Sequence, residues 1–418
     1  MAKLVIRGGR SLHGKIGVQG MKNAATKLIA ASLLTREECL LRNVPLVRDV
    51  VRMVELVGSL GATVRWDDPH TLRIRCQDVS QTSLDRGAVK SMRSSIALLG
   101  PMLARFHDIT LPEPGGDNIG KRPLDTNFFA LRALGATIQG TGDSYHLAAP
   151  RIKAATIILP EFSVGTTENA LMAAALTPER TVIKLAAVEP SVQELMKFLR
   201  AMGAVVEEIA THTLAITGAR ELRGVEHTIA PDNLEVGTFA VAAAATESTL
   251  EIAPIEPLHI ESTLEKLRAI GVSCIVRADT LFVKPEGALR AFRVQTMPFP
   301  GFPTDLQAPL GVLATQCHGT SLIHDPLFEG RMGYVSELVK MGADAVICDP
   351  HRVLVTGRTP LTGREVPSLD IRSGATLVLA GLVAHGTTVI NDAEVLDRGY
   401  EDLAGRLKGL GADITRVD

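Results

Sequence analysis

Amphipathic stretches that alternate with runs of β-branched residues recur along the whole chain. Six glycines each follow apolar residues at helical spacing and precede a run of β-branched or apolar residues. Each glycine has Leu, Met or Ile before it and Ala or Val after it; the six are Gly61, Gly135, Gly203, Gly271, Gly342 and Gly411. The pattern predicts a helix that ends at the glycine, a tight exit with positive φ there, and then a strand.

The spacing of these glycines predicts six copies of one unit. Successive glycines lie 68 to 74 residues apart, close to one sixth of the 418-residue chain. Further strands are expected at the N-terminus and at residues 71–75 and 281–284, which follow turn residues. Alternation of helices with strands favours an α/β fold with helices packed on one face of each sheet.

Six such units exceed one comfortable hydrophobic core, which favours two domains of three units each. The chain has turn residues at 230–233, and residues 17–21 are a candidate for a second crossing. We therefore expect one domain at residues 22–230 and a second at 1–21 with 231–418. Two crossings suggest a cleft that opens and closes, with the active site in it.

Composition narrows the class of protein. The chain is 46% hydrophobic and 22% charged, which excludes a disordered tail, and its formal net charge of −2 gives no overall signature of binding to nucleic acid or an anionic membrane. The longest apolar stretches, near residues 239–245 and 375–384, are too short to span a bilayer, and the N-terminus has no apolar leader, so we expect a cytoplasmic protein.

The five cysteines lack metal-ligand spacing. They are odd in number and each lies in or beside an apolar run; they are Cys39, Cys76, Cys274, Cys317 and Cys348. Structural zinc and a disulfide framework are both disfavoured by this pattern. Buried, inert thiols are therefore expected, with a lone reactive thiol as the alternative.

The most unusual loop candidate is at residues 111–123. It contains a pair of glycines, which permit backbone conformations that other residues avoid, and it presents Asp117 beside Lys121 and Arg122. This composition suits a mobile lid that carries an acid, and it equally suits a solvated surface connection.

Other charged residues stand next to Gly or Pro, several of them at the starts of predicted helices. Free N–H groups at such starts attract anions, and Arg and Lys side chains hold carboxylate or phosphate oxygens. Taken singly, each Arg is more often part of a surface ion pair. Composition and spacing therefore indicate a two-domain α/β enzyme with an anionic substrate, and go no further.

Eight motifs together carry a resemblance to a known family. They lie at residues 22–25 (Lys-Asn-Ala-Ala), 92–95, 111–123, 163–165, 231–232, 302–305, 328–331 and 397–401. In this order, over essentially the whole chain, they resemble the UDP-N-acetylglucosamine 1-carboxyvinyltransferase family. The resemblance implies two inside-out α/β domains, each of three βαβαββ-like units, in agreement with the sixfold period.

The resemblance also implies a reaction. The family transfers the enolpyruvyl group of phosphoenolpyruvate to the 3′-hydroxyl of UDP-N-acetylglucosamine and releases phosphate, in the first committed step of peptidoglycan synthesis. The implied partners are these two substrates, with no metal or organic cofactor, no nucleic acid and no membrane.

By this resemblance Lys22, Arg122 and Arg398 grip the phosphate and carboxylate of phosphoenolpyruvate, with Asn23 beside them, and Asp305 accepts the proton of the sugar hydroxyl. Further residues are implied to bind substrate; they are Arg93, Pro123, Leu124, Asp125, Ser163, Val164, Gly165, Leu327, Arg331 and Arg372. Asp370 and Arg372 have structural pairing as an alternative role. Positioned cations and a general base suit an addition through an oxocarbenium-like species and a tetrahedral phosphate ketal.

Three departures from the family pattern stand out. Most members carry Cys where this chain has Asp117, so the acid that protonates C3 of phosphoenolpyruvate is expected to be Asp117 here. Fosfomycin, which alkylates that thiol in the family, should then find no nucleophile. In addition, Glu161 stands where the family often has Lys near the diphosphate, and Asn233 replaces a common Arg, which leaves room for a specialised paralogue.

Two alternatives stay open. The shikimate-pathway enolpyruvyl transferase shares the fold and the phosphoenolpyruvate half-reaction, but its Gly-Asp-Lys-Ser-type N-terminal motif differs from residues 20–23 of this chain. A catalytically inactive paralogue that binds UDP-sugar is the other alternative. Retention of Lys22, Asp117, Arg122, Asp305 and Arg398 argues against it.

Overall fold

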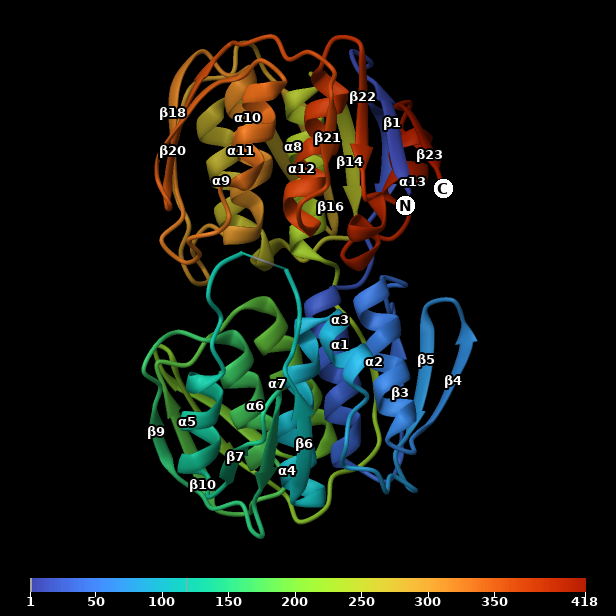
Figure 1. The fold of residues 1–418 in the computed structure, drawn as a ribbon, viewed down its shortest axis with the longest axis vertical. Helices are drawn as coiled ribbons and strands as arrows, with labels where there is room; N and C mark the ends of the chain where they lie inside the picture. Colours follow the sequence, from blue (N-terminus) through green and yellow to red (C-terminus); the bar gives the residue numbers. More distant parts are fainter. Residues whose placement is uncertain (1, 118) are drawn as a thin grey trace. The chain divides into compact units, whose positions relative to one another are not determined.

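A computed structural model describes residues 2–117 and 119–418 (Figure 1). The described chain forms two compact units. Unit 1 holds residues 2–19, 119–121 and 231–418, and unit 2 holds residues 20–117 and 122–230. Each unit has a hydrophobic core of its own.

One repeat of unit 2 shows the common plan. Its elements are β9 (Thr156–Ile158), α6 (Val164–Ala174), β10 (Arg180–Lys184), α7 (Pro190–Met202), β11 (Val205–Ala210) and β12 (Thr213–Thr217). β9 pairs with β10 in parallel, and β12 pairs antiparallel with both β10 and β11. The repeat is therefore a βαβαββ unit with sheet order β11-β12-β10-β9.

The other two repeats of unit 2 follow this plan with small variations. The first contains α1 (Lys22–Ala31), η1 (Ser32–Leu34), β3 (Glu38–Arg42), α2 (Arg48–Ser59), β4 (Thr63–Asp68) and β5 (Thr71–Arg75). The second contains α3 (Arg86–Ser91), η2 (Arg93–Leu98), α4 (Leu99–Phe106), β6 (Asp108–Pro112), α5 (Asp125–Ala133), β7 (Thr137–Gly140) and β8 (Ser144–Ala148). In the second repeat a bridge between Ser83 and Thr110 stands in place of the parallel first strand.

Unit 1 repeats the plan three times. Its first repeat has α8 (Asn233–Ala245), β14 (Thr249–Ala253), η3 (Pro257–His259), α9 (Glu261–Ile270), β15 (Val272–Arg277) and β16 (Thr280–Pro285). Its second has β17 (Arg293–Gln295), η4 (Thr304–Leu306), α10 (Gln307–Gln316), β18 (Gly319–His324), α11 (Gly333–Lys340), β19 (Asp344–Asp349) and β20 (Arg352–Gly357). Its third has β21 (Glu365–Pro367), α12 (Ile371–Val383), β22 (Thr387–Asn391), η5 (Ala393–Arg398), α13 (Leu403–Gly409) and β23 (Asp413–Val417).

Strands distant in sequence complete three of the repeats. β13 (Glu226–Thr228) pairs in parallel with β3 and supplies the first strand of the α1 repeat. β2 (His13–Gly17) does the same for the α8 repeat by pairing with β14. β1 (Lys3–Arg7) lies between β22 and β23 and supplies the last strand of the final repeat.

The interior of each unit is helical, with sheets on the outside. In unit 1, α8, α10 and α12 contact one another and are almost entirely buried (Figure 1). In unit 2, α1, η2, α4 and α6 pack together in the same way. The sequences of these helices have almost no polar face, because sheets and neighbouring helices surround them on all sides. The predicted fold class, two inside-out α/β domains of three repeats, is confirmed.

The six repeated glycines all adopt positive φ, between +99° and +116°. Each follows the end of an outer helix and leads into a strand. The left-handed backbone conformation is energetically unfavourable for residues with a Cβ and nearly free of strain for glycine. Glycine therefore recurs at the point where each outer helix ends and the chain turns into a strand. The predicted helix–glycine–strand step is confirmed at all six positions.

Two local predictions are wrong. Cys348 is exposed, whereas the other four cysteines are buried as expected. It lies on β19, a strand at the edge of its sheet whose register shifts between Ile347 and Asp349, so its side chain misses the core. Leu111 and Pro112 belong to β6 rather than to the predicted loop, because they pair with Tyr145 and Ser144.

None of the helices in residues 2–117 and 119–418 combines the length and the apolar character that crossing a membrane requires.

Candidate active site

Several predicted site residues lie at the N-terminal ends of buried helices in their repeats. In unit 2, Lys22 begins α1, Arg93 begins η2, and Ser163 caps α6 by accepting a hydrogen bond from the Thr166 N–H. The first N–H groups of a helix have no partner within it, and the helix dipole is positive there. These ends therefore suit anionic groups of a substrate.

The ammonium group of Lys22 is held by a carboxylate of the same repeat. Its Nζ lies 3.4 Å from Oδ2 of Asp49, which stands in the first turn of α2, and the two side chains are only 11% and 5% exposed. Asn23 follows Lys22 and is half-buried, and its carbonyl oxygen accepts a hydrogen bond from Lys27 Nζ at 3.1 Å. Lys22 is thus a fixed cation beside the start of α1.

Two guanidinium groups meet at the base of the loop at residues 113–123. Arg122 Nη2 donates to the carbonyl oxygen of Asp117 at 2.6 Å, and Arg93 donates to the carbonyl oxygen of Arg122. Burial, together with the charge of Arg122, lowers the pKa of Arg93 to about 10. An anion bound here would relieve this repulsion and gain two cationic partners.

The glycine pair of this loop is needed for its close approach to neighbouring backbone. A Cβ on Gly115 would lie 1.8 Å from the carbonyl oxygen of Lys90. Gly116 has φ +118°, and a Cβ there would lie 2.8 Å from Cβ of Arg93. The expectation that these glycines adopt conformations that other residues avoid is confirmed for Gly116, whereas Gly115 is needed for the close approach alone. Asp117, which follows them, is half-buried.

Residues 119–121 of this loop belong with unit 1. The Lys121 N–H donates to Oε1 of Glu329 at 2.8 Å, and the Gly330 N–H donates to the carbonyl oxygen of Ile119 at 3.1 Å. The hydrogen bond from Lys121 is the main cause that lowers the pKa of Glu329. The loop is therefore an ordered structure with defined partners at these positions.

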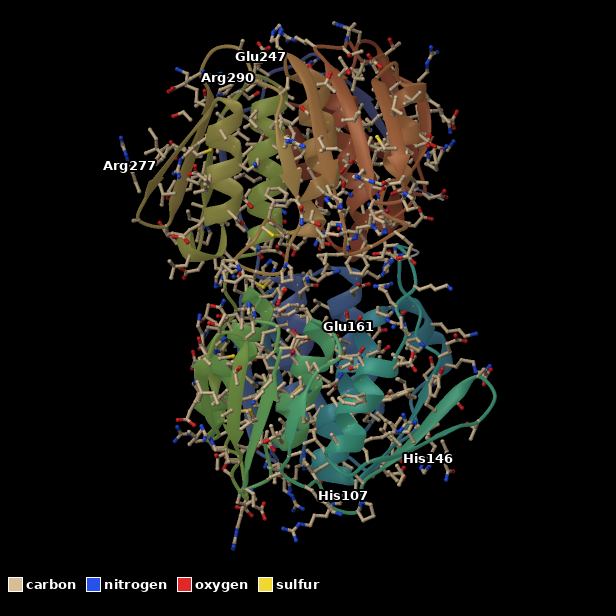
Figure 2. The ribbon with its side chains drawn as sticks, turned by 90° about the vertical axis from the view of Figure 1, so that its left-hand side faces the viewer. His107, His146, Glu161, Glu247, Arg277 and Arg290 are labelled. Carbon is tan, nitrogen blue, oxygen red and sulfur yellow. The ribbon has the colours of Figure 1, made fainter. Side chains whose placement is uncertain are left out.

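A pocket of about 710 Å³ opens on unit 2. It is lined by Pro123, Asp125, Thr126, Phe129, Arg132, Ala133, Pro160 and Glu161. Glu161 follows β9, is exposed, and accepts a hydrogen bond from the Thr126 hydroxyl at 2.7 Å (Figure 2). Two predicted substrate-binding residues, Pro123 and Asp125, thus face a recess, and Leu124 between them is buried.

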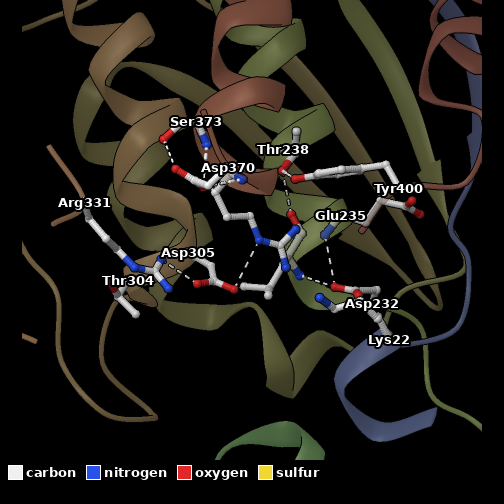
Figure 3. Close-up of polar contacts among 12 residues, drawn as sticks. Lys22, Asp232, Glu235, Thr238, Thr304, Asp305, Arg331, Asp370, Ser373 and Tyr400 are labelled. Atoms are coloured by element: carbon white, nitrogen blue, oxygen red, sulfur yellow. Dashed lines mark hydrogen bonds and ion pairs between the residues drawn. The ribbon is translucent and has the colours of Figure 1, made fainter. Parts of the chain in front are cut away.

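In unit 1, Asp305 is clamped by two arginines (Figure 3). It lies in η4, directly before α10, and its Oδ1 accepts from Arg331 Nη1 at 2.6 Å while its Oδ2 accepts from Arg372 Nε at 3.2 Å. All three side chains are at most 20% exposed. The clamp fixes the carboxylate in orientation as a hydrogen-bond acceptor.

Arg372 is held from several sides. Its guanidinium stacks over the ring of Tyr400 at 5.3 Å, and the hydroxyl of Tyr400 forms a 2.9 Å hydrogen bond with that of Thr238. Burial disfavours the charge of Arg372, but Tyr400, Asp305 and Asp232 outweigh it and raise its pKa above the ordinary value. Arg372 is therefore a permanent buried cation.

Asp370 caps α12 and has no ion pair with Arg372 through its side chain among the described contacts. Its carboxylate accepts from the N–H groups of Arg372 and Ser373 at 2.9 and 3.1 Å. Asp232 caps α8 in the same way, by accepting from Leu234 and Glu235. Asp370 therefore has a structural role as the N-cap of α12, which differs from the pairing with Arg372 that the sequence left open.

Three further residues that the sequence analysis singled out lie in unit 1. Arg398 ends η5 and is half-buried, two positions before Tyr400. Leu327 has a side chain at the surface, while its N–H donates to Oδ1 of Asp325 at 3.1 Å. Asn233 is the first residue of α8 and is half-buried.

Sequence reasoning missed two carboxylates that organise this site. Asp49 pairs with Lys22, and Asp325 holds both Leu327 and the hydroxyl of Thr304. The partners that reveal both residues lie on other segments. Each residue had one local signal: Asp49 stands in the first turn of a helix, and Asp325 directly precedes Pro326.

The chain resembles proteins of one family over its whole length. Residues 6–407 match the family model described as EPSP synthase (3-phosphoshikimate 1-carboxyvinyltransferase). UDP-N-acetylglucosamine 1-carboxyvinyltransferase from Bradyrhizobium diazoefficiens is 41% identical, covering 99% of this chain and 97% of the relative. The protein of the same name from Koribacter versatilis is also 41% identical, over 100% of this chain and 97% of its own length.

Solved structures show the same fold. The enolpyruvyl transferase NikO from Streptomyces tendae superimposes with a TM-score of 0.90 at 25% identity, covering 100% of this chain and 99% of that one. EPSP synthase from Acinetobacter baumannii gives a TM-score of 0.77 at 19% identity, with both chains covered completely, and this supports the fold alone. From the similarity across the full chain, we conclude that this protein belongs to the EPSP synthase family and, within it, to the UDP-N-acetylglucosamine 1-carboxyvinyltransferases.

Proposed function

We propose that the protein transfers the enolpyruvyl group of phosphoenolpyruvate to the 3′-hydroxyl of UDP-N-acetylglucosamine and releases phosphate, as in peptidoglycan synthesis. The observation that carries the proposal is the clamped carboxylate of Asp305, held by Arg331 and Arg372 at the start of a buried helix. A fixed carboxylate suits a general base, and the cations around it suit an anionic substrate. The names of the full-length relatives supply the identity of the acceptor.

The chemistry assigns complementary roles to the base and an acid. Asp305 accepts the proton of the 3′-hydroxyl while the 3′-oxygen of the sugar bonds to C2 of phosphoenolpyruvate. An acid delivers a proton to C3. The resulting tetrahedral phosphate ketal then loses a proton from C3 and the phosphate from C2, which restores the double bond. The products are the enolpyruvyl ether of the sugar and inorganic phosphate.

Three cations hold phosphoenolpyruvate in this proposal. Lys22, Arg122 and Arg398 bind its phosphate and carboxylate, with Asn23 beside them. The fixed Lys22 ammonium and the pair of guanidiniums at Arg93 and Arg122 support this assignment, because both are cations held in place before the substrate arrives.

The nucleotide sugar occupies the second set of residues. The pocket that Pro123 and Asp125 line supports binding of its nucleotide part. The other residues proposed to bind the nucleotide sugar are Leu124, the α6 cap Ser163, the first α6 residues Val164 and Gly165, and Leu327, whose side chain is exposed. Arg331 and Arg372 orient Asp305 and contact the substrate beside it. A pocket of this size suits a ligand of nucleotide dimensions.

We further propose that Asp117 is the acid that protonates C3 in place of the family's usual cysteine. Its position after the glycine pair and its half-buried state support this role. An aspartate serves as an acid when a closed, water-poor site favours its neutral form. The consequence is that fosfomycin has no thiol to alkylate at this position.

Release of phosphate tests the proposal. The protein is mixed with phosphoenolpyruvate and, in separate reactions, with UDP-N-acetylglucosamine or shikimate 3-phosphate. Release with the UDP-sugar alone supports the proposal. Release with shikimate 3-phosphate alone would transfer the assignment to the shikimate-pathway reaction, and binding of UDP-sugar without phosphate release would indicate an inactive paralogue.

A further inference from the structure

A buried carboxylate links two of the segments that carry predicted site residues in unit 1. Asp325 follows β18 and has no exposed surface. Its Oδ1 accepts from the Thr296 hydroxyl at 2.7 Å and from the Leu327 N–H at 3.1 Å, and its Oδ2 accepts from the Thr304 hydroxyl at 2.5 Å. Both oxygens are thus used, by three donors from three segments.

Asp325 is itself held rigidly. Its N–H donates to the carbonyl oxygen of His351 at 2.8 Å, and its own carbonyl oxygen lies 2.8 Å from Nδ1 of His351. His351 belongs to the turn between β19 and β20. The backbone of Asp325 is therefore fixed to the turn between β19 and β20. Its carboxylate in turn holds Thr296, Thr304 and Leu327 in place through its hydrogen bonds.

Burying a carboxylate is costly, and the three hydrogen bonds to this one come from two hydroxyl groups and a backbone N–H rather than from a Lys or Arg side chain. Hydroxyl and amide donors offset the cost only in good geometry, whereas an apolar residue of similar size would fill the space at less expense. We therefore interpret the buried carboxylate as a group that fixes the positions of its hydrogen-bond partners.

The partners of Asp325 are the neighbours of the proposed chemistry. Thr304 directly precedes Asp305, and Leu327 opens the short segment that leads to Arg331, the arginine on Oδ1 of Asp305. One carboxylate thus sets the distance between the segment that carries the base and the segment that carries its clamp. The third partner, Thr296, lies just after β17, eight residues before Thr304, and its hydroxyl is not part of the link between Thr304 and Leu327.

We propose that Asp325 is a positioning residue for the general base: through Thr304 and Leu327 it aligns Asp305 with Arg331. The inference rests on the proposed function for the role of Asp305. The same three hydrogen bonds leave the Leu327 N–H occupied, so any substrate contact at this residue is made by its side chain or carbonyl oxygen.

Two threonine variants test the proposal without removing the buried charge. Thr304→Val and Thr296→Val each delete one hydroxyl donor to Asp325 and keep the side-chain shape, so their effects on stability should be similar. We expect Thr304→Val to lower kcat about tenfold with little change in KM for the sugar, because the misplaced base acts only in the reaction. Thr296→Val should leave kcat within about threefold of wild type.

Thr304→Ser serves as the conservative rescue, since it keeps the hydroxyl, and it should restore most of the lost kcat. Hydrogen exchange of the peptide at residues 303–307 gives a readout that does not require turnover, and exchange should rise in Thr304→Val but not in Thr296→Val. Equal losses of kcat in the two valine variants, or a wild-type kcat in Thr304→Val, would overturn the positioning role.

The two proposals fail in different ways. Wild-type protein that releases no phosphate would refute the proposed function, and the exchange measurement would still decide whether Asp325 fixes the Thr304 segment. Wild-type protein that turns over, with identical exchange and identical kcat in both valine variants, would refute the positioning role alone.

Discussion

Arg372 Nε lies 3.2 Å from Oδ2 of Asp305 although 67 residues separate them in the chain. This separation is one repeat length, and both residues stand at the start of the buried helix of their repeat, Asp305 before α10 and Arg372 in the first turn of α12. Because α10 packs against α12, repetition of one unit brings the two helix starts together. The internal repeat thus builds the clamp on the base.

Asp305→Asn should remove the base while keeping its shape. We expect kcat to fall by about a hundredfold or more, because general base catalysis contributes on this scale. Steady-state kinetics of phosphate release measure the effect. Asp344→Asn, an exposed change of the same kind on β19, is the matched control and should behave as wild type. Turnover of Asp305→Asn within about threefold of wild type would remove Asp305 from the chemistry.

Two substitutions of Asp117 should show whether it is the acid and whether the absence of a thiol at this position explains insensitivity to fosfomycin. Asp117→Asn should lose turnover because an amide donates no proton to C3, whereas Asp117→Cys should keep turnover and become sensitive to fosfomycin. Intact-protein mass spectrometry after incubation with fosfomycin detects the adduct. A covalent adduct on the wild-type protein, or full activity of Asp117→Asn, would refute the assignment of the acid.

Glu161→Lys should tighten binding of the nucleotide sugar. Glu161 lines the pocket of unit 2, and replacing its negative charge with a positive one favours a diphosphate nearby. We expect KM for UDP-N-acetylglucosamine to fall about fivefold at low salt, and by less at high salt because ions screen the interaction. Glu221→Lys makes the same charge change at an exposed position outside the pocket lining, so an equal effect there would contradict a local role for Glu161.

Glu194 should make the stability of unit 2 depend on pH in the acid range. Burial raises the pKa of this α7 side chain, but hydrogen bonds from His227 and Lys197 outweigh burial and lower the pKa from 4.5 to about 2. The ionised form therefore stabilises the fold above pH 4.5, and this contribution, about 3 kcal/mol, is lost as the pH falls toward 2.

Denaturant unfolding of wild type and Glu194→Gln between pH 3 and 7 measures this contribution. The difference in the free energy of unfolding should be largest at pH 7 and shrink steadily below pH 4.5. Glu208→Gln removes an exposed partner of Arg200 and should show a much smaller difference over the same range. A difference for Glu194→Gln that stays constant with pH would show that its ionisation is not linked to folding.

The repeat architecture could be predicted because one steric requirement recurs. A helix that must turn at once into a strand needs left-handed backbone, so Gly61 and its five equivalents mark the period directly. The loop glycines Gly115 and Gly116 are likewise visible in the sequence, since close backbone approach leaves no room for a Cβ. Local conformational demands of this kind leave a signal in the residue type itself.

The pairings between distant segments could not be predicted in the same way. β1 inserts between β22 and β23, and β13 completes the sheet of β3, because each sheet lacks a strand that only a remote segment supplies. The roles of Asp49 and Asp325 were invisible for the same reason, since a carboxylate shows its function only through partners brought close by the fold. The exposure of Cys348 could not be predicted because it follows from the position of β19 at the edge of its sheet, and the order of strands is not visible in the local sequence.

The most direct test of the account is the reaction in deuterium oxide with phosphoenolpyruvate and UDP-N-acetylglucosamine, followed by mass spectrometry of the sugar product. Addition of a solvent-derived proton to C3 before loss of phosphate predicts an enolpyruvyl ether that carries deuterium in its methylene group, formed in equal amount to phosphate. Absence of this ether, or an ether free of deuterium throughout the reaction, would contradict enolpyruvyl transfer by addition and elimination.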